Sequence, residues 1–226
     1  MKILITSGGT RVPIDSVRSI TNMSKGTYGK NLLVECVNEL QFRKIPPTGV
    51  EIIFLHAKGS AVPEIDLNMD RQVKVTYIEF DTYQDYHDIA VEIVSEDMPS
   101  VIVSAAAVSD YTVVPFKGKM SSNENVTLEL IKTEKVLPRL KNLLLGQSCC
   151  IIGFKLMVSP SYGMVYDAVK KVLDEGADYV VCNDLTELRK GNSKRLLFDR
   201  DMKHREIENV VTLAKFVIDQ CELMCF

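Results

Sequence analysis

Residues 2–11 read KILITSGGTR and decide the fold class of this chain. A short apolar run, Lys2–Thr6, ends just before a pair of glycines, Gly8 and Gly9. Such a run is typical of a buried strand, and adjacent glycines let backbone amides approach a phosphate closely. The segment matches neither the GxGxxG dinucleotide fingerprint nor the GxxxxGK(S/T) P-loop. Taken alone, the glycine pair is as typical of a tight turn as of a phosphate site.

The rest of the chain repeats this alternation of short apolar runs and amphipathic stretches. Strands are expected at Lys2–Thr6, Val50–Leu55, Val73–Ile78, Ser100–Ala105, Cys150–Phe154 and Tyr179–Cys182. Helices are expected at Thr27–Leu40, Gln84–Ser95, Lys135–Leu144, Tyr162–Glu175 and Glu206–Met224. Apolar strands interleaved with helices predict an α/β fold, a mostly parallel sheet with helices on both faces. Ligands of such sheets bind outside the carboxyl ends of the strands.

Two segments depart from this pattern. Val126–Leu130 alternates apolar and polar residues, as a half-exposed strand does, and Arg195–Phe198 follows a turn-like stretch. We interpret them as partners in a small antiparallel excursion, which is a candidate dimer surface. The sequence contains no internal repeat and no linker. We therefore expect one domain that comprises residues 1–226.

Composition excludes several classes of function. An apolar content of 46%, a charged content of 25% and a net charge of -3 fit a globular protein without a nucleic-acid partner. Apolar runs are too short to cross a membrane, and no signal peptide is recognisable. The six cysteines include no CxxC pair, and only three histidines are present, so reduced thiols and no structural zinc are expected. We expect a soluble, cytoplasmic protein.

The polar segment Val12–Gly29 is a candidate binding loop, because long irregular connections in compact domains are often functional. It offers Arg18, Asn22 and Ser24 just before an expected helix. Backbone amides there can receive a phosphate or a carboxylate. The alternative is purely structural: Asn22 or Ser24 caps the helix and Arg18 forms a surface ion pair.

Two further segments follow the fourth expected strand. In SAAAVSDY, residues 104–111, small side chains leave room for a flat base or ribose, and Asp110 can accept hydrogen bonds from ribose hydroxyls. Close packing with Asp110 as a cap is equally consistent with the residues. Lys117 and Lys119 flank a glycine in what reads as a mobile flap, which can close over a reactive intermediate and exclude water. Lysines of this kind are also common as solvated surface charges.

The last two strand ends are less specific. Gly153-Phe154-Lys155 offers an aromatic ring on which a base can rest, although Phe154 is equally suited to the core. Cys182-Asn183-Asp184 ends another strand, where Asn and Asp often only begin a turn.

Taken together, these segments resemble the phosphopantothenate–cysteine ligases, also called phosphopantothenoylcysteine synthetases. The resemblance rests on six segments in the family's order: ITSGGTRVPIDSVRSITNMSKGTYG, SAAAVSDY, the KGK flap, LIKTEKVL, GFKLM and CND. They extend over nearly the whole chain. Many bacteria fuse this ligase behind a flavin-dependent decarboxylase. Here the matching motif begins at residue 3, so we expect a stand-alone ligase.

The resemblance implies a Rossmann-like homodimer that works in two half-reactions. The carboxylate of 4'-phosphopantothenate attacks the α-phosphate of a nucleotide triphosphate, which gives an acyl nucleotidylate and pyrophosphate. The amine of L-cysteine then attacks the acyl group and releases the nucleoside monophosphate. Magnesium should accompany the triphosphate. The protein must position the reactants and shield the reactive acyl phosphate from water.

The resemblance also implies roles for individual residues. Asn22 would hydrogen-bond the acyl or phosphate oxygens, Arg18 would support its loop, and Lys117 would serve aminolysis from the flap. Contacts with the nucleotide or its phosphates would come from Gly8, Gly9, Ser24, Ser104, Ala105, Ala106, Asp110, Lys119, Glu134, Lys135, Val136, Leu137, Phe154 and Lys171.

Two departures from the bacterial pattern concern the nucleotide. Asn22 is followed by Ser24-Lys25-Gly26 where the bacterial form commonly reads Ser-Gly-Lys, and Glu175 stands where a second lysine is usual. CTP, the usual bacterial choice, is the expected nucleotide, and ATP is the alternative.

Two other readings compete with a ligase. A nucleotide- or flavin-dependent oxidoreductase is disfavoured by the missing dinucleotide fingerprint. A catalytically silent nucleotide sensor is disfavoured because binding alone needs neither Asn22 nor Lys117.

Overall fold

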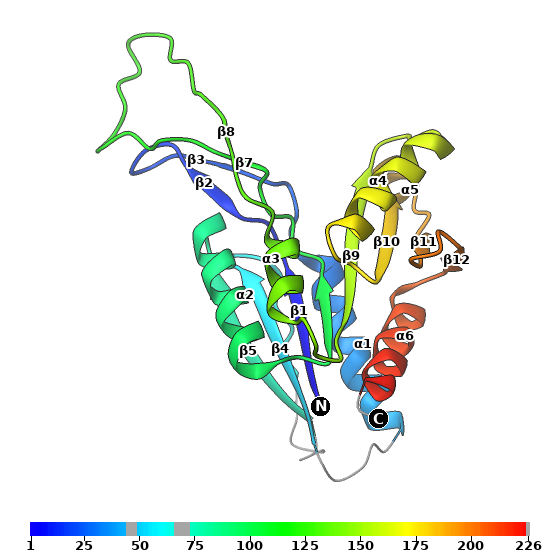
Figure 1. The fold of residues 1–226 in the computed structure, drawn as a ribbon. Coiled ribbons are helices and arrows are strands. Elements are labelled where there is room, and N and C mark those ends of the chain that lie inside the picture. Colours follow the sequence, from blue (N-terminus) through cyan, green and yellow to red (C-terminus); the bar gives the residue numbers. More distant parts are fainter. Residues whose placement is uncertain (44–48, 66–72, 225–226) are drawn as a thin grey trace.

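The main body of the protein is one twisted sheet between two layers of helices (Figure 1). The computed structural model describes residues 1–43, 49–65 and 73–224. The sheet has the order β12-β11-β10-β9-β6-β1-β4-β5. Its parallel strands are β1 (Lys2–Ser7), β4 (Val50–Ala57), β5 (Val73–Phe80), β6 (Val101–Ser104), β9 (Cys150–Met157) and β10 (Tyr179–Asp184). The predicted α/β, Rossmann-like sheet is confirmed.

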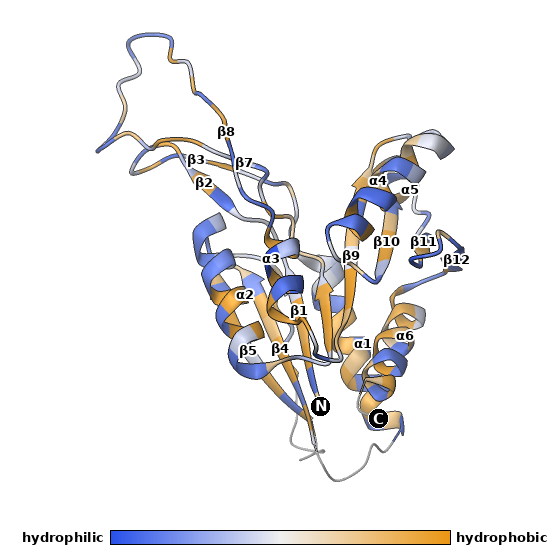
Figure 2. Ribbon diagram, in the orientation of Figure 1, coloured by the Kyte–Doolittle hydropathy of each residue, from blue (hydrophilic) through white to orange (hydrophobic). Residues whose placement is uncertain are grey.

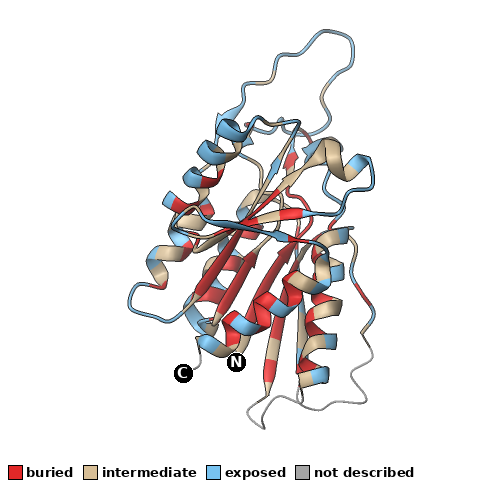
Figure 3. Ribbon diagram, turned by 90° about the vertical axis from the view of Figure 1, so that its right-hand side faces the viewer, coloured by how far each residue is buried: buried red, intermediate tan, exposed pale blue. Residues whose placement is uncertain are grey.

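Helices cover both faces of the sheet because the central strands are apolar on both sides (Figure 2). In β1, Ile3 and Ile5 belong to the cluster beneath α1 (Thr27–Arg43) and α6 (Val210–Leu223). Leu4 faces the opposite way, toward α2 (Tyr83–Asp97) and α3 (Val136–Leu143). A third cluster joins β9 and β10 to α4 (Tyr162–Asp174). Figure 3 shows the buried residues gathered in the strands and on the inner sides of the helices.

Two antiparallel strands extend the sheet at one edge. β11 (Arg195–Phe198) pairs with β10 and with β12 (His204–Ile207). Arg195–Phe198 is therefore antiparallel as predicted, but its predicted partner is wrong. Val126–Leu130 was predicted to be a strand, but the structure shows none there. The short strand β8 (Ile131–Lys132) begins directly after it and pairs with β7 (Tyr111–Thr112).

The last helix is shorter than the sequence pattern predicts. The expected start at Glu206 is wrong, because His204–Ile207 pairs as β12 and the helix begins only at Val210. Asn209 caps it by accepting a hydrogen bond from the backbone amide of Thr212 at 3.0 Å. Apolar spacing continues through the strand into the helix, so only the cap residue marks the boundary. A short helix, α5 (Leu185–Arg189), follows β10 and was not expected from the sequence.

An arm projects from the carboxyl end of the sheet (Figure 1). We define the arm as residues 11–21 and 111–132. The first part holds the hairpin of β2 (Arg11–Pro13) and β3 (Ser19–Thr21), a stretch expected to be irregular, and the second holds β7 and β8. The two parts are joined by backbone hydrogen bonds from Ser16 to Gly118 at 3.0 Å and from Phe116 to Ile14 at 2.8 Å.

Among the described residues no cysteine is part of a disulfide, and most of these side chains are buried: Cys36, Cys149, Cys150, Cys182 and Cys221. Cys225 lies outside the described residues. Burial raises the pKa of both Cys149 and Cys150 to about 12, which keeps these thiols protonated and unreactive at neutral pH. Among the helices that the structure describes, none is both long and apolar enough to span a bilayer.

Candidate functional site

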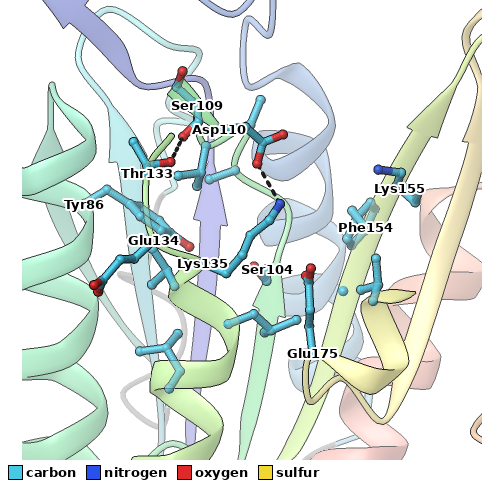
Figure 4. Close-up of a pocket in the computed structure, with 18 of the residues that line it drawn as sticks. Tyr86, Ser104, Ser109, Asp110, Thr133, Glu134, Lys135, Phe154, Lys155 and Glu175 are labelled. Atoms are coloured by element: carbon cyan, nitrogen blue, oxygen red, sulfur yellow. Dashed lines mark hydrogen bonds and ion pairs between the residues drawn. The ribbon is translucent and has the colours of Figure 1, made fainter. Parts of the chain in front are cut away.

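A pocket of about 290 Å³ lies where the carboxyl ends of β6 and β9 meet α3 and α4 (Figure 4). This is the edge of the sheet at which parallel α/β folds bind ligands. Three segments that are far apart in sequence surround it: residues 104–110, 133–137 and 153–156. Its lining comprises Tyr86, Ser104, Ala106, Ala107, Val108, Ser109, Asp110, Thr133, Glu134, Lys135, Val136, Leu137, Leu140, Gly153, Phe154, Lys155, Leu156, Lys171, Val172 and Glu175.

Hydrogen bonds fix the loop that follows β6. Thr6 accepts from the Ala106 amide at 3.1 Å through its hydroxyl, and Thr10 accepts from the Ser109 amide at 2.9 Å. Thr133 donates its hydroxyl to the Ser109 carbonyl at 2.8 Å, which ties this loop to the start of α3. The small residues of SAAAVSD thereby form a shaped rim to the pocket, as expected for a surface that receives a flat ligand.

An ion pair spans the mouth of the pocket. Lys135 donates to a carboxylate oxygen of Asp110 at 2.6 Å. Burial of Lys135 opposes its charge, but the hydrogen bond and charge of Asp110, with a contribution from Glu175, raise the pKa of the Lys135 ammonium. Both side chains of the ion pair are more than a third exposed, so the pair adds at most about 1 kcal/mol to stability. It is better suited to orienting a ligand.

The opposite wall depends on a glycine. A Cβ on Gly153 would come within 2.7 Å of Val172 Cγ1, so glycine is what lets α4 pack against β9. That packing brings Lys171 and Glu175 to the pocket. In Figure 4, Glu175 extends into the pocket across from Lys135. Phe154 completes the wall, with its ring edge-on to Tyr28 at a centroid distance of 5.8 Å.

Tyr86 is a member of the pocket that the sequence did not reveal. It lies on α2 and is 1% exposed. Burial raises the pKa of its hydroxyl, while hydrogen bonds with the side chains of Thr6 and Ser104 act in the opposite direction. Tyr86 thus links the ends of β1 and β6 beneath the pocket. In the sequence, Tyr86 shows only the spacing of a buried residue on an amphipathic helix, and residues that merely pack in the core show the same spacing.

The glycine pair after β1 brings the β1 and β6 loops together. Gly8 has φ +86°, and a Cβ there would lie 2.6 Å from Ala57 Cβ. Its carbonyl accepts from the Ala107 amide at 2.7 Å. Asn22 donates its side-chain amide to the Ala107 carbonyl at 2.6 Å, and a Cβ on Gly9 would touch Asn22 at 3.0 Å. Asn22 is therefore a bridge between loops and remains exposed.

Arg18 is anchored in the arm. Its guanidinium donates to Asp15 at 3.2 Å and to the Met120 carbonyl at 3.3 Å. The Asp15 carboxylate is buried and accepts from the backbone amides of Val17, Arg18 and Met120. The backbone hydrogen bond from Val17 is the largest factor that lowers the pKa of Asp15. Arg18 therefore supports the base of the flap segment.

The predicted site residues thus fall into two groups. The pocket is lined by Ser104, Ala106, Asp110, Glu134, Lys135, Val136, Leu137, Phe154 and Lys171. Ala105 lies in the same loop but outside the lining, and Gly8, Gly9 and Ser24 lie around the Asn22 loop. Lys117 and Lys119 are exposed on the arm and do not reach the pocket of their own chain.

The pocket combines three lysines with three carboxylates and two aromatic rings, namely Lys135, Lys155, Lys171, Asp110, Glu134, Glu175, Tyr86 and Phe154. Such a lining suits a ligand that carries both a flat ring and negative charge. Within the described part of the chain, no three His, Cys, Asp or Glu side chains gather as metal ligands.

Comparison with known proteins identifies relatives over most of the chain. A family model described as the DNA/pantothenate metabolism flavoprotein C-terminal domain matches residues 1–222. Coenzyme A biosynthesis bifunctional protein CoaBC of Thermococcus kodakarensis is 31% identical over 202 residues, 88% of this chain and 45% of the relative. CoaBC of Methanocaldococcus jannaschii is 30% identical over 82% of this chain and 41% of the relative. The chain thus spans less than half the length of these relatives.

Solved structures share the fold. The DNA/pantothenate metabolism flavoprotein from Streptococcus pneumoniae superposes with a TM-score of 0.79 at 25% identity, covering 99% of both chains. A Cab2 mutant, H337A, in complex with phosphopantothenate-cysteine also gives a TM-score of 0.79, at 21% identity, over 99% of this chain and 87% of that one.

Proposed function

Because the chain belongs to the DNA/pantothenate metabolism flavoprotein C-terminal domain family, we propose that it is a phosphopantothenate–cysteine ligase. In this proposal it joins 4'-phosphopantothenate to L-cysteine in coenzyme A biosynthesis. The CoaBC relatives carry the name of that pathway, and the Cab2 mutant was solved with phosphopantothenate-cysteine bound.

One observation carries the proposal. The segments SAAAVSD, TEKVL and GFKL, on which the sequence resemblance rests, surround a single pocket at the carboxyl edge of the sheet. The Asn22 loop is tied to that edge through Ala107. The pocket and an exposed amide donor, Asn22, are therefore held at the same edge of the sheet, which suits a two-step acyl transfer.

In the first half-reaction the pocket holds the nucleotide. The carboxylate oxygen of 4'-phosphopantothenate attacks the α-phosphorus, and pyrophosphate leaves with the electrons of the broken P–O bond. Lys135, Lys155 and Lys171 line the pocket and offset the negative charge of the phosphates. Asn22 donates to an oxygen of the acyl nucleotidylate, which stabilises the charge that develops there.

In the second half-reaction the neutral amine of cysteine attacks the acyl carbon. The C–N bond forms while the C–O bond to the nucleotidyl phosphate breaks, and the amine loses a proton to solvent. The nucleoside monophosphate leaves. Residues that position the intermediate and exclude water favour the amide over hydrolysis.

CTP is the nucleotide that we propose, with ATP as the alternative. Glu175 in the pocket is a hydrogen-bond acceptor, which suits an exocyclic amino group. Cytosine and adenine both carry such a group. The resemblance to bacterial ligases favours CTP.

Magnesium is proposed to enter with the triphosphate. Mg²⁺ is commonly held by substrate phosphates, waters and one or two protein carboxylates, and it supplies charge neutralisation. Asp110 at the pocket is the carboxylate that we propose to contribute to it. A protein-made cage is not required, which fits the absence of a three-ligand cluster among the described residues.

We further propose a homodimer formed through the arm. The arm exposes apolar side chains, namely Val17, Ile20, Val114, Phe116, Val126 and Leu130, which is unusual for a surface that stays in water. Lys117 also lies on the arm, is exposed and does not line the pocket of its own chain. Contact with a second copy would cover the apolar residues and give Lys117 access to a pocket.

The test is a reaction of the purified protein with 4'-phosphopantothenate, magnesium and either CTP or ATP, with and without cysteine. Pyrophosphate and products are measured, the latter by mass. A cysteine-dependent amide with one nucleotide supports the ligase and identifies the nucleotide. Nucleotide binding without pyrophosphate from either nucleotide would favour the silent sensor instead.

A further inference from the structure

A second pocket, of about 210 Å³, opens at the carboxyl end of β10 and has no role in the function proposed above. It lies between the start of β11, the start of α5 and the residues that lead into α4. Its lining comprises Pro160, Val165, Cys182, Asn183, Asp184, Glu187, Asn192, Lys194, Arg195, Leu196 and Glu206.

Arg195 is the unusual member of this lining, because it is a buried cation without an anion. The residue is 9% exposed, and none of the ion pairs among the described residues includes it. Its guanidinium stacks on the Tyr28 ring at 4.0 Å and donates one Nη1 hydrogen bond to the Ser193 carbonyl. Its Nε finds no partner within the described chain. A buried charge of this kind is costly unless an anion accompanies it.

A buried acceptor lies beside this donor. The Oδ1 atom of Asn183 is buried and also lacks a hydrogen-bond partner among the described residues. Cys182 on β10 is paired in register with Leu196 on the antiparallel strand β11. Asn183, which follows Cys182, therefore lies across from Arg195, which precedes Leu196. The positively charged donor Arg195 Nε and the acceptor Asn183 Oδ1, both without a hydrogen-bond partner among the described residues, are thus close neighbours in one pocket. A ligand that satisfies both carries a negative group and a hydrogen-bond donor.

The other charges of the lining are already occupied. Glu206 pairs with Lys194 at 2.8 Å, and Glu187 pairs with Lys190 at 2.7 Å. Asp184 caps α5 by accepting from the Thr186 amide at 2.8 Å. With three carboxylates and two cations in the lining, the pocket carries a small negative excess. That excess disfavours a phosphate dianion and tolerates a zwitterion.

This pocket adjoins the nucleotide pocket. Asn183 pairs in register with Leu156 on the neighbouring strand β9, and Leu156 lines the first pocket. A molecule bound at Asn183 therefore lies next to the place where the proposed acyl nucleotidylate forms.

We propose that the second pocket is the subsite for the α-amino acid substrate, an inference that rests on the proposed ligase function. The α-carboxylate binds Arg195, and the amino nitrogen lies at Asn183 Oδ1. The small side chain faces the apolar part of the wall at Cys182, Val165 and Leu196. Cysteine is small enough for a pocket of this volume.

The test compares two amines that differ only in the carboxylate, cysteine and cysteamine. In Arg195→Gln, kcat/KM for cysteine is expected to fall by about tenfold or more, because a charge-assisted hydrogen bond is lost. The kcat/KM values for cysteamine, for CTP and for 4'-phosphopantothenate are expected to stay within about twofold of those of the wild-type protein. Arg200→Gln is the control, because Arg200 is an exposed arginine that pairs with Asp178 outside both pockets.

Other outcomes overturn the subsite. Equal losses with cysteine and cysteamine would make Arg195 structural, and a raised KM for 4'-phosphopantothenate would assign the pocket to its phosphate. If Arg195→Gln does not fold, Asn183→Leu is used, and it should raise the KM for both amines. A wild-type protein without ligase activity refutes the proposed function; equilibrium dialysis with labelled cysteine then tests the subsite separately, and binding unaffected by Asn183→Leu counts against it.

Discussion

Asn22 donates its side-chain amide to the main-chain carbonyl oxygen of Ala107 at 2.6 Å, although the two residues are separated by 85 positions in the sequence. This contact joins the loop after β3 to the loop after β6. The contact explains why these two segments, which are far apart in the sequence, lie at the same edge of the sheet.

Asn22→Ala should abolish most of the catalysis and little of the stability. Asn22 is exposed, so the fold loses one hydrogen bond, whereas loss of an amide donor to a developing charge costs about 100-fold or more in kcat. Amide formation and pyrophosphate release measure the effect. Asn38→Ala is the control, because Asn38 is exposed on α1 and its side chain donates to Glu35 on the same helix. Near-normal activity of Asn22→Ala would refute the role.

Lys135→Gln should weaken nucleotide binding. It removes a cation from the pocket mouth and frees Asp110, which then repels the phosphates. We expect the KM for the nucleotide to rise about tenfold, in the range typical of a lost charge-assisted contact. Lys203→Gln, which breaks an exposed pair with Asp201 outside both pockets, is the matched control. A change confined to the KM for cysteine would contradict the prediction.

Gly153→Ala should destabilise the protein by about 2 kcal/mol. The added Cβ would lie 2.7 Å from Val172 Cγ1, and overpacking of a core contact costs about 1–3 kcal/mol. Gly163→Ala, at the second position of α4, meets no atom within 4 Å and should change the stability by no more than about 0.5 kcal/mol. Urea unfolding of both variants measures the difference. Equal stabilities would show that α4 can move away from β9 freely.

The Asp15 carboxylate should make the arm sensitive to acid. Its pKa is lowered, so its ionised form stabilises the fold above the ordinary pKa of an aspartate, and this stabilisation is lost as the pH falls through the lowered value. Asp15→Asn should therefore destabilise the protein at pH 6 more than at pH 3. Urea unfolding at both pH values provides the measurement. A pH-independent difference would show that hydrogen bonding alone, without the charge, accounts for the effect.

Removal of apolar side chains from the arm should yield a monomer. Val114 and Phe116 are exposed and lie beside Lys117. The double variant Val114→Ser, Phe116→Ser is expected to sediment as a monomer and to lose cysteine-dependent amide formation. Val211→Ser, at an exposed apolar position on α6, is the control. A wild-type protein that sediments as a monomer at assay concentrations would refute the dimer.

Much of the pocket could be predicted because its signals are local. SAAAVSD and GFK follow apolar strands, and the carboxyl ends of parallel strands meet at one edge. Tyr86 and Arg195 could not be predicted in the same way. A tyrosine on an amphipathic helix is indistinguishable from an ordinary core residue, and an arginine is expected to be exposed until packing buries it.

The sequence by itself determined the six parallel strands and the five longer helices between and after them, because apolar period and glycine position act over a few residues. It also predicted three of the segments that line the pocket. Only the tertiary structure decided that Val126–Leu130 is not a strand, that Arg195–Phe198 joins the main sheet, and that Lys117 lies on an arm away from its own pocket. Pairing partners and distances between loops depend on how the whole sheet twists and packs, and no local pattern encodes them.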